Sequence, residues 1–138
     1  MRKVISAAIA SALIAGAPAM AAPLAKSEAK LQKILEGRVA GEPVDCVRLT
    51  DIRSSRIIDR TAIVYEGRNN TIYVNRPDGG AQSLSPWDVM VTRPFNNQLC
   101  DIDVVNLYDP GSRMQSGVVF LGEFVPYKKV AAARADRP

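Results

Sequence analysis

The two cysteines of the chain, Cys46 and Cys100, place the strongest constraint on its fold. Both lie among alternating apolar and polar residues, a pattern that is typical of β-strands. Two cysteines allow one intramolecular disulfide, which would close a loop of about 55 residues and stabilise the fold by roughly 4 kcal/mol in the chain-entropy model. A pair of buried free thiols is the alternative. A catalytic thiol is disfavoured, because the sequence has no C-x-x-C motif and no histidine to lower a cysteine pKa.

The N-terminus predicts the oxidising compartment that a disulfide needs. A short basic segment precedes an uncharged, apolar run over residues 4–17, and Ala19-Met20-Ala21 has the small-x-small pattern of a signal peptidase site. We therefore predict a signal peptide over residues 1–21 and a periplasmic mature protein. An uncleaved membrane anchor is the alternative, but an apolar run of about 14 residues is short for a bilayer that needs about 20. We expect no transmembrane anchor after cleavage.

The distribution of charge disfavours a nucleic-acid partner. The chain carries 18 Lys and Arg against 14 Asp and Glu, but part of this excess lies in the leader and in residues 128–138. Residues 44–127 contain eight arginines, no lysine and ten acidic residues. A domain that binds phosphate backbones would concentrate positive charge on its body, so we expect no nucleic-acid binding.

Residues 22–43 are predicted to form a short N-terminal helix and a hinge. Ser27 is the expected helix cap, Gly37 the expected end, and Gly41-Glu42-Pro43 the hinge. The apolar stripe of this helix consists of Leu24, Leu31, Ile34 and Leu35.

Residues 44–127 are predicted to form a disulfide-linked, β-rich domain, and residues 128–138 a flexible basic tail. Strand patterns occur at residues 44–49, 55–59, 61–66, 71–76, 89–92, 102–108 and 118–127. The fold class is therefore mainly β, at the margin of α+β. We expect a small antiparallel β roll or barrel of six or seven short strands with one N-terminal helix.

Two further features of this domain can be predicted from local patterns. Residues 67–70 predict a hairpin turn of two or four residues, since Gly and Asn tolerate positive φ. Either length would place Ile63, Tyr65, Ile72 and Val74 together on the core face, with Val64, Tyr73 and Asn75 opposite. Trp87 is the expected packing anchor of the irregular stretch that follows.

The absence of histidine removes most common catalytic sites. It excludes Ser-His-Asp triads, Cys-His dyads and histidine zinc sites, and oxidised cysteines would exclude thiolate zinc sites. We expect no cofactor and no metal. Asp101 and Asp103 lie two apart on a predicted strand, hence on one face, where a carboxylate pair could share a proton. Solvated acids on the outer face are the alternative reading.

Four closely spaced arginines are the better candidate for a binding site. Arg48, Arg53, Arg56 and Arg60 lie within 13 residues, and guanidinium groups suit carboxylate or phosphate partners. The alternative is that these arginines form internal ion pairs with the neighbouring Asp51 and Asp59 and cover apolar surface with their stems.

The order of these segments resembles a family of small exported proteobacterial proteins of unknown function, common in sphingomonad-type genomes. The segments that carry the resemblance are Cys46-Val47-Arg48-Leu49, the stretch 51–59, Thr71-Ile72-Tyr73-Val74-Asn75-Arg76, Gln98-Leu99-Cys100, Ile102-Asp103 and Leu121-Gly122-Glu123-Phe124-Val125-Pro126. The resemblance spans residues 44–127 and implies a periplasmic, disulfide-containing, β-rich domain without assigned activity or catalytic residues. Some relatives carry a second cysteine pair near residues 77–80 and 119–122, where this sequence has none.

Together these patterns predict a non-catalytic periplasmic binding or structural module. Its partner would be an envelope protein or an anionic envelope component held by the arginine group. The alternative function is a carboxylate-dependent hydrolase of cell-wall glycan that uses Asp101 or Asp103.

Overall fold

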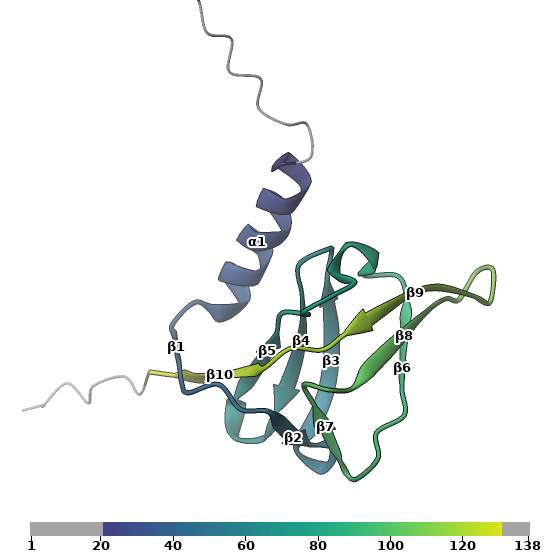
Figure 1. The fold of residues 1–138 in the computed structure, drawn as a ribbon. Coiled ribbons are helices and arrows are strands. Elements are labelled where there is room, and N and C mark those ends of the chain that lie inside the picture. Colours follow the sequence, from purple (N-terminus) through teal and green to yellow (C-terminus); the bar gives the residue numbers. More distant parts are fainter. Residues whose placement is uncertain (1–20, 131–138) are drawn as a thin grey trace, which may run out of the picture.

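The computed structural model describes residues 21–130, which form one α-helix, ten β-strands and three short 3₁₀ turns (Figure 1). The helix α1 spans Ala21–Leu35, and the 3₁₀ turns are η1 (Leu49–Asp51), η2 (Arg68–Asn70) and η3 (Ala81–Ser83). The strands are β1 (Arg38–Ala40), β2 (Cys46–Arg48), β3 (Ile52–Ile58), β4 (Ala62–Gly67), β5 (Ile72–Asn75), β6 (Val89–Thr92), β7 (Gln98–Cys100), β8 (Val104–Asp109), β9 (Met114–Phe120) and β10 (Phe124–Lys129). The predicted signal peptide, except Ala21, and the end of the predicted tail lie outside the described residues.

The strands form three antiparallel sheets, which confirms a mainly β, antiparallel fold. The large sheet has the order β1-β10-β5-β4-β3, and two smaller sheets have the orders β6-β8-β9 and β2-β7. The described residues contain ten strands rather than six or seven. Two added strands, β1 and β7, lie outside the seven predicted ranges. The single strand predicted over residues 118–127 is divided into β9 and β10.

The large sheet is buried on both faces by two separate apolar cores. One core lies between this sheet and the two smaller sheets and includes Ile63, Tyr65, Phe124, Val47, Leu99, Val105, Leu107 and Val119. The other lies under the helix, where Leu31 and Leu35 pack against Ala62, Val64 and Val74. Strand β4 therefore carries a continuous apolar run over residues 62–65, as expected of a strand that is covered on both sides.

The helix presents a four-residue repeat to the sheet. Ser27, Leu31 and Leu35 are buried, whereas Leu24 is 45% exposed and lies outside the stripe. Because the helix runs from Ala21, Ser27 lies in its interior, and the prediction of Ser27 as the cap is wrong. The prediction for Gly37 is confirmed: its φ of 70° is a left-handed conformation that favours glycine and ends the helix.

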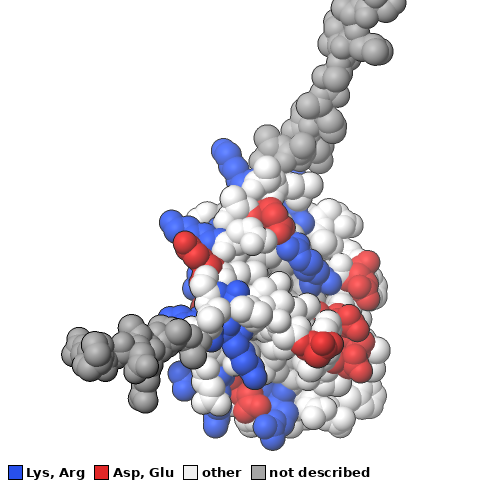
Figure 2. Space-filling model, turned by 90° about the vertical axis from the view of Figure 1, so that its left-hand side faces the viewer, with Lys and Arg blue, Asp and Glu red and all other residues white. Residues whose placement is uncertain are grey.

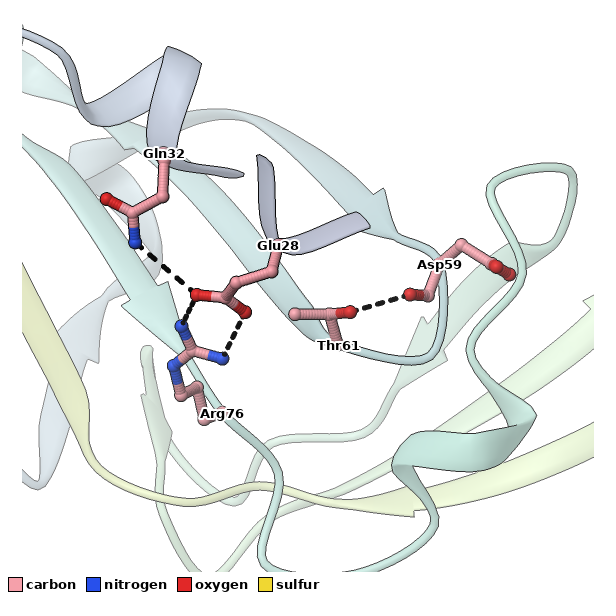
Figure 3. A network of polar contacts seen from close by, with 5 residues as sticks. All are labelled: Glu28, Gln32, Asp59, Thr61 and Arg76. Atoms are coloured by element: carbon pink, nitrogen blue, oxygen red, sulfur yellow. Dashed lines mark hydrogen bonds and ion pairs between the residues drawn. The ribbon is translucent and has the colours of Figure 1, made fainter. Parts of the chain in front are cut away.

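An ion pair fixes the helix to the sheet from the side (Figure 3). The Arg76 guanidinium donates to both oxygens of Glu28, from Nη2 to Oε1 at 2.6 Å and from Nη1 to Oε2 at 3.2 Å, and Gln32 donates to the same carboxylate at 3.4 Å. The hydrogen bond from Arg76 holds the pKa of Glu28 below its usual range. Its position beside the turn at residues 77–80 suggests a solvated side chain, but Arg76 anchors the helix to the sheet.

The predicted disulfide is confirmed. Cys46 on β2 and Cys100 on β7 are directly opposite one another, with Cα atoms 4.0 Å apart, and they are bonded across 54 residues of sequence. The alternative of two free thiols is wrong. The bridge joins the two strands of the short sheet β2-β7, which closes one side of the core between the large and the smaller sheets.

The β4–β5 hairpin forms as predicted, but with a different register. Its turn has three residues, Arg68–Asn70, and both Asn69 and Asn70 have positive φ. An odd loop length places Val64 opposite Val74 and Tyr65 opposite Tyr73, so Ile63 and Tyr65 face one core while Ile72 and Val74 face the other. The predicted single core face of these four residues is therefore wrong.

Asn75 is fully buried, rather than on an outer face as predicted. Its side-chain amide pairs with the peptide groups of Gly122: the Gly122 N–H donates to Oδ1 at 3.1 Å, and Nδ2 donates to the Gly122 carbonyl oxygen. Gly122 lies between β9 and β10, where a Cβ atom would come within 2.5 Å of the Arg76 carbonyl oxygen. The strand predicted over residues 118–127 is interrupted at Gly122, where the Asn75 amide pairs with the backbone.

Two smaller expectations also differ from the structure. Trp87 is 83% exposed and is no packing anchor; Leu84, at 1% exposure, fills the core from this segment. Lys128 and Lys129 belong to β10 rather than to a tail, because they pair with Val39 and Arg38 of β1.

Candidate functional site

The structure separates the four arginines that the sequence placed together. Arg48 pairs with Asp51 at 3.0 Å, and Arg56 pairs with Glu66 on the neighbouring strand at 3.2 Å. Both arginines thus form internal ion pairs, as in the alternative reading, but only Arg48 uses a predicted partner, Asp51, since Arg56 pairs with Glu66 rather than with Asp59. Arg60 lies in the exposed turn after β3 with a φ of 51°.

Arg53 remains as the candidate for ligand binding. Its side chain is exposed on β3, and within residues 21–130 it makes no ion pair and no side-chain hydrogen bond. It lines a pocket of about 320 Å³ together with Arg38, Glu66, Gly67, Asn70, Thr71 and Ile72. This pocket lies over the turned end of the β4–β5 hairpin, on the helix-bearing side of the sheet.

Arg38 enters this pocket from β1, at the opposite edge of the large sheet. Its guanidinium donates to the Asn70 carbonyl oxygen and, at 2.9 Å, to the Asn70 side-chain oxygen. The left-handed conformation of Asn70, with a φ of 59°, presents both oxygens to the same side chain. Arg38 is thereby held over the hairpin turn with no carboxylate among its described partners.

The pocket therefore combines two guanidinium groups with one carboxylate, and that carboxylate already pairs with Arg56. Guanidinium groups are suited to bidentate contacts with a carboxylate or phosphate group, and two arginines line this concave site. A volume of about 320 Å³ is at the small end for ligand pockets, so the site suits one acidic group rather than a whole drug-sized molecule.

Charges of both signs are mixed on the surface of the molecule. Figure 2 shows basic and acidic side chains interspersed over one face of the molecule, with several acidic side chains gathered along one side. The view shows no unbroken basic area of the kind that binds a polyanion along its length.

The acidic candidates are divided between a pocket and a turn. Asp101 lines a second pocket, of about 470 Å³, together with Asp78 and Glu123. Asp103 instead accepts a hydrogen bond from the Cys100 N–H at 2.7 Å and closes the turn after β7. Residues 101–103 precede β8 rather than forming part of it, so the prediction that the two carboxylates share a strand face is wrong.

Neither a metal centre nor a membrane helix is found in the described part of the chain. Between residues 21 and 130, no three Cys, Asp or Glu side chains lie close enough to hold a metal ion. In the same range, no helix has the length and apolar character to cross a bilayer.

The contacts of Arg38 and Arg76 could not be predicted from the sequence. Arg38 donates hydrogen bonds to Asn70, which is 32 residues away in the sequence. Arg76 donates hydrogen bonds to Glu28, which is 48 residues away. No local pattern marks either contact. Comparison with known proteins yields no matching family model, no matching curated protein and no matching solved structure.

Proposed function

We propose that this chain is an exported, non-catalytic binding module of the cell envelope, which holds a carboxylate or phosphate group of an envelope component between Arg38 and Arg53. The observation that carries the proposal is the shared pocket of these two arginines, neither of which has an acidic partner in residues 21–130. The leader pattern and the resemblance to small exported proteins support the envelope as the compartment.

The hydrolase alternative has less support in this geometry. A pair of cooperating carboxylates was its requirement, and Asp103 is engaged by the Cys100 backbone while Asp101 faces a different pocket. We therefore assign no catalytic role to either carboxylate. An Asp101→Asn variant that lost a measurable glycan-hydrolysing activity of the wild type would reinstate the alternative.

Co-sedimentation tests the binding function and distinguishes the two sources of anionic groups. Purified peptidoglycan sacculi present peptide carboxylates, and vesicles of phosphatidylglycerol present phosphates. We expect the oxidised protein to sediment with one of them. Because a charge-assisted hydrogen bond contributes about 1.5–3 kcal/mol, the Arg53→Ala variant should bind at least about tenfold more weakly.

A matched control separates the pocket from general electrostatics. The Arg38→Ala/Arg53→Ala variant and the Arg93→Ala/Arg113→Ala variant lose the same charge, but only the first pair lines the pocket. We expect binding to be lost in the first variant and kept in the second. Equal binding by the two double variants, or no sedimentation of the wild type with either material, would contradict the proposal.

A further inference from the structure

Strand β3 forms an edge of the large sheet, and this edge is open. The strand pairs with β4 on one side alone, and residues 53–56 are all exposed. The other edge strands are shorter or covered: β1, β2 and β7 have three residues each, β6 has four, and β9 is bridged at Phe120 to Gly79. An open edge offers unpaired N–H and carbonyl groups to another chain.

The direction of the peptide groups in β3 follows from the turn after it. The Thr61 N–H donates to the Ile58 carbonyl oxygen at 3.0 Å, so Ile58 directs its peptide groups toward β4. Successive residues of a strand direct these groups to opposite sides, and the register is continuous over residues 54–58. The N–H and carbonyl groups of Ile57 and Ser55 therefore point away from β4.

The same reasoning places the Met90 peptide groups at the open edge of β6. The Phe120 N–H donates to the Gly79 carbonyl oxygen, so Phe120 faces away from β8. Three residues earlier on β9, Gly117 faces β8, and its partner Leu107 faces β9 in return. Leu107 thus directs its peptide groups away from β6, and Met90, which pairs with Leu107, directs its own away from β8.

These outward peptide groups lie along one groove between β3 and β6. The groove has a volume of about 390 Å³, and its lining includes Ser55, Arg56, Ile57, Val89 and Met90. An extended chain that rises about 3.3 Å per residue, in a space about 4.8 Å wide and 10 Å high, occupies about 160 Å³ per residue. The groove therefore has room for about two residues of such a chain, and the rest of the segment would continue along the edge.

Backbone is the chemistry that this groove lacks. Within residues 21–130, no third segment donates to or accepts from the outward groups of Ser55, Ile57 or Met90. Ile57 is 5% exposed, so its peptide groups face a confined space rather than open solvent. Nearly all buried peptide groups in proteins have a partner. Donors and acceptors that recur every second residue match another extended backbone, as in β-strand addition.

Side chains along the groove define the pattern of that segment. On the core side, Ile57 and Met90 are apolar and contact the inner core. On the helix side, Lys30 and Arg56 are basic and exposed, and the lining contains a single acid, Asp88. Because neighbouring strands match their side chains on each face, the segment should carry apolar side chains toward the core and acidic ones toward the helix.

We propose that the groove between β3 and β6 binds an extended segment of a partner protein, in which apolar and acidic residues alternate and which pairs antiparallel with β3. A second copy of β3 is a poorer occupant, because pairing Ser55 with Ile57 about a two-fold axis would place Arg56 opposite itself. Residues 131–138 of this chain fit poorly as well, since they contain two arginines, one aspartate and no β-branched residue.

A blocked synthetic heptapeptide that alternates glutamate and valine tests the proposal on the oxidised protein. NMR titration with up to about 1 mM peptide should give saturable shifts. In the complex, the Ser55 and Ile57 amides should exchange more slowly with solvent. The Arg56 amide, which faces β4, should change little.

The Ser55→Pro variant removes the outward N–H and leaves the hydrogen bonds to β4 in place. Ser55→Ala is the matched control, because it loses the same hydroxyl and keeps the N–H. We expect the proline variant to bind the peptide at least about tenfold more weakly and the alanine variant to bind as the wild type does. Thermal melts should show that both variants are folded.

Two altered peptides test the same contacts on the wild-type protein, whether or not the proline variant folds. In antiparallel pairing the valines lie opposite Ser55 and Ile57, so N-methylation of the valines should weaken binding at least about tenfold. Lysine in place of glutamate should weaken it as well. The proposal is overturned by absence of saturable binding, by equal binding of the two folded Ser55 variants, or by undiminished binding of either altered peptide.

Discussion

Asn75 shows how a single buried amide can define the end of a strand. Its side chain imitates a neighbouring peptide, because it accepts from the Gly122 N–H and donates to the Gly122 carbonyl. The pair satisfies the backbone polar groups of Gly122 where the chain leaves β9 and enters β10. A buried peptide group without a hydrogen-bond partner would destabilise the fold by about 1–3 kcal/mol, because it has lost its hydration.

Replacement of Asn75 by alanine should therefore destabilise the fold strongly. We expect the free energy of unfolding to fall by about 2–4 kcal/mol, since two buried peptide groups lose their partners. Urea denaturation of the oxidised protein measures this change. Asn97→Ala is the control, because Asn97 is exposed; equal losses in the two variants would refute the role of the buried amide.

The Glu28–Arg76 pair predicts a modest dependence of stability on pH. The pKa of Glu28 is lowered in the folded state, chiefly by the hydrogen bond from Arg76, so the pair stabilises the fold above the ordinary glutamate pKa of about 4.3. This contribution is lost as the pH falls through the lower folded value. The two side chains are 42% and 53% exposed, which limits the contribution to less than about 1 kcal/mol.

Comparison of the wild type with Glu28→Gln at two pH values tests this prediction. At neutral pH the variant should be slightly less stable in denaturant unfolding, and near pH 3 the difference should shrink toward zero. A difference that stays the same at both pH values would show that Glu28 acts through packing rather than through charge.

At the scale of elements, strand existence could be predicted more reliably than strand pairing. Alternation and turn residues identified the strands around Cys46, the hairpin at residues 67–70 and the strand over residues 89–92. The three-residue strands β1 and β7 lie outside the predicted strand ranges, because pairing with β10 and β2 defines them; around Cys100 the sequence indicated strand-like surroundings but no bounded strand. The predicted register of the β4–β5 hairpin was wrong because the prediction assumed a turn with an even number of residues, whereas the turn has three.

The contact between the end of β9 and Gly79 predicts a site for a second disulfide. Gly79 and Phe120 are joined by a backbone hydrogen bond of 2.9 Å, and a Cβ atom added at Gly79 would lie 3.9 Å from the Phe120 Cβ. Disulfides have Cβ separations of about 3.5–4.5 Å. Gly79→Cys with Phe120→Cys should therefore oxidise spontaneously without displacing the Cys46–Cys100 bridge.

Peptide mapping by mass spectrometry under non-reducing conditions measures this outcome. Gly80→Cys with Phe120→Cys is the control, because Gly80 has a φ of 79° and a Cβ there would come within 2.1 Å of the Val118 carbonyl oxygen. We expect an intact second bridge in the Gly79 variant and free thiols or misfolded protein in the control. Free thiols in a folded Gly79 variant would contradict the pairing of these segments.

At the scale of the whole molecule, the candidate site depends on which strands form the edges of the large sheet. Arg38 and Arg53 come from β1 and β3, the two outermost strands, and reach one pocket across the hairpin between them. The sequence spacing of the arginines indicated a cluster along the chain. In the folded chain, Arg53 is the member of this cluster that lines the pocket, and the distant Arg38 lies there with it. Arg48 pairs with Asp51, as the alternative reading of the sequence predicted, whereas Arg56 pairs with Glu66 on the neighbouring strand.

Export of the chain is the claim on which both the disulfide and the envelope function depend. The disulfide between Cys46 and Cys100 requires an oxidising compartment in an ordinary bacterial cell, and the predicted signal peptide over residues 1–21 would deliver the chain to one. An envelope ligand for Arg38 and Arg53 requires the same compartment.

Intact mass spectrometry of fractionated cells, after thiol alkylation without reduction, tests this claim most directly. We predict a periplasmic protein that begins at Ala22 and carries no alkylated cysteine. A cytosolic protein that retains Met1 and is alkylated on both Cys46 and Cys100 would contradict the compartment, the bridge in the cell and the proposed envelope function together.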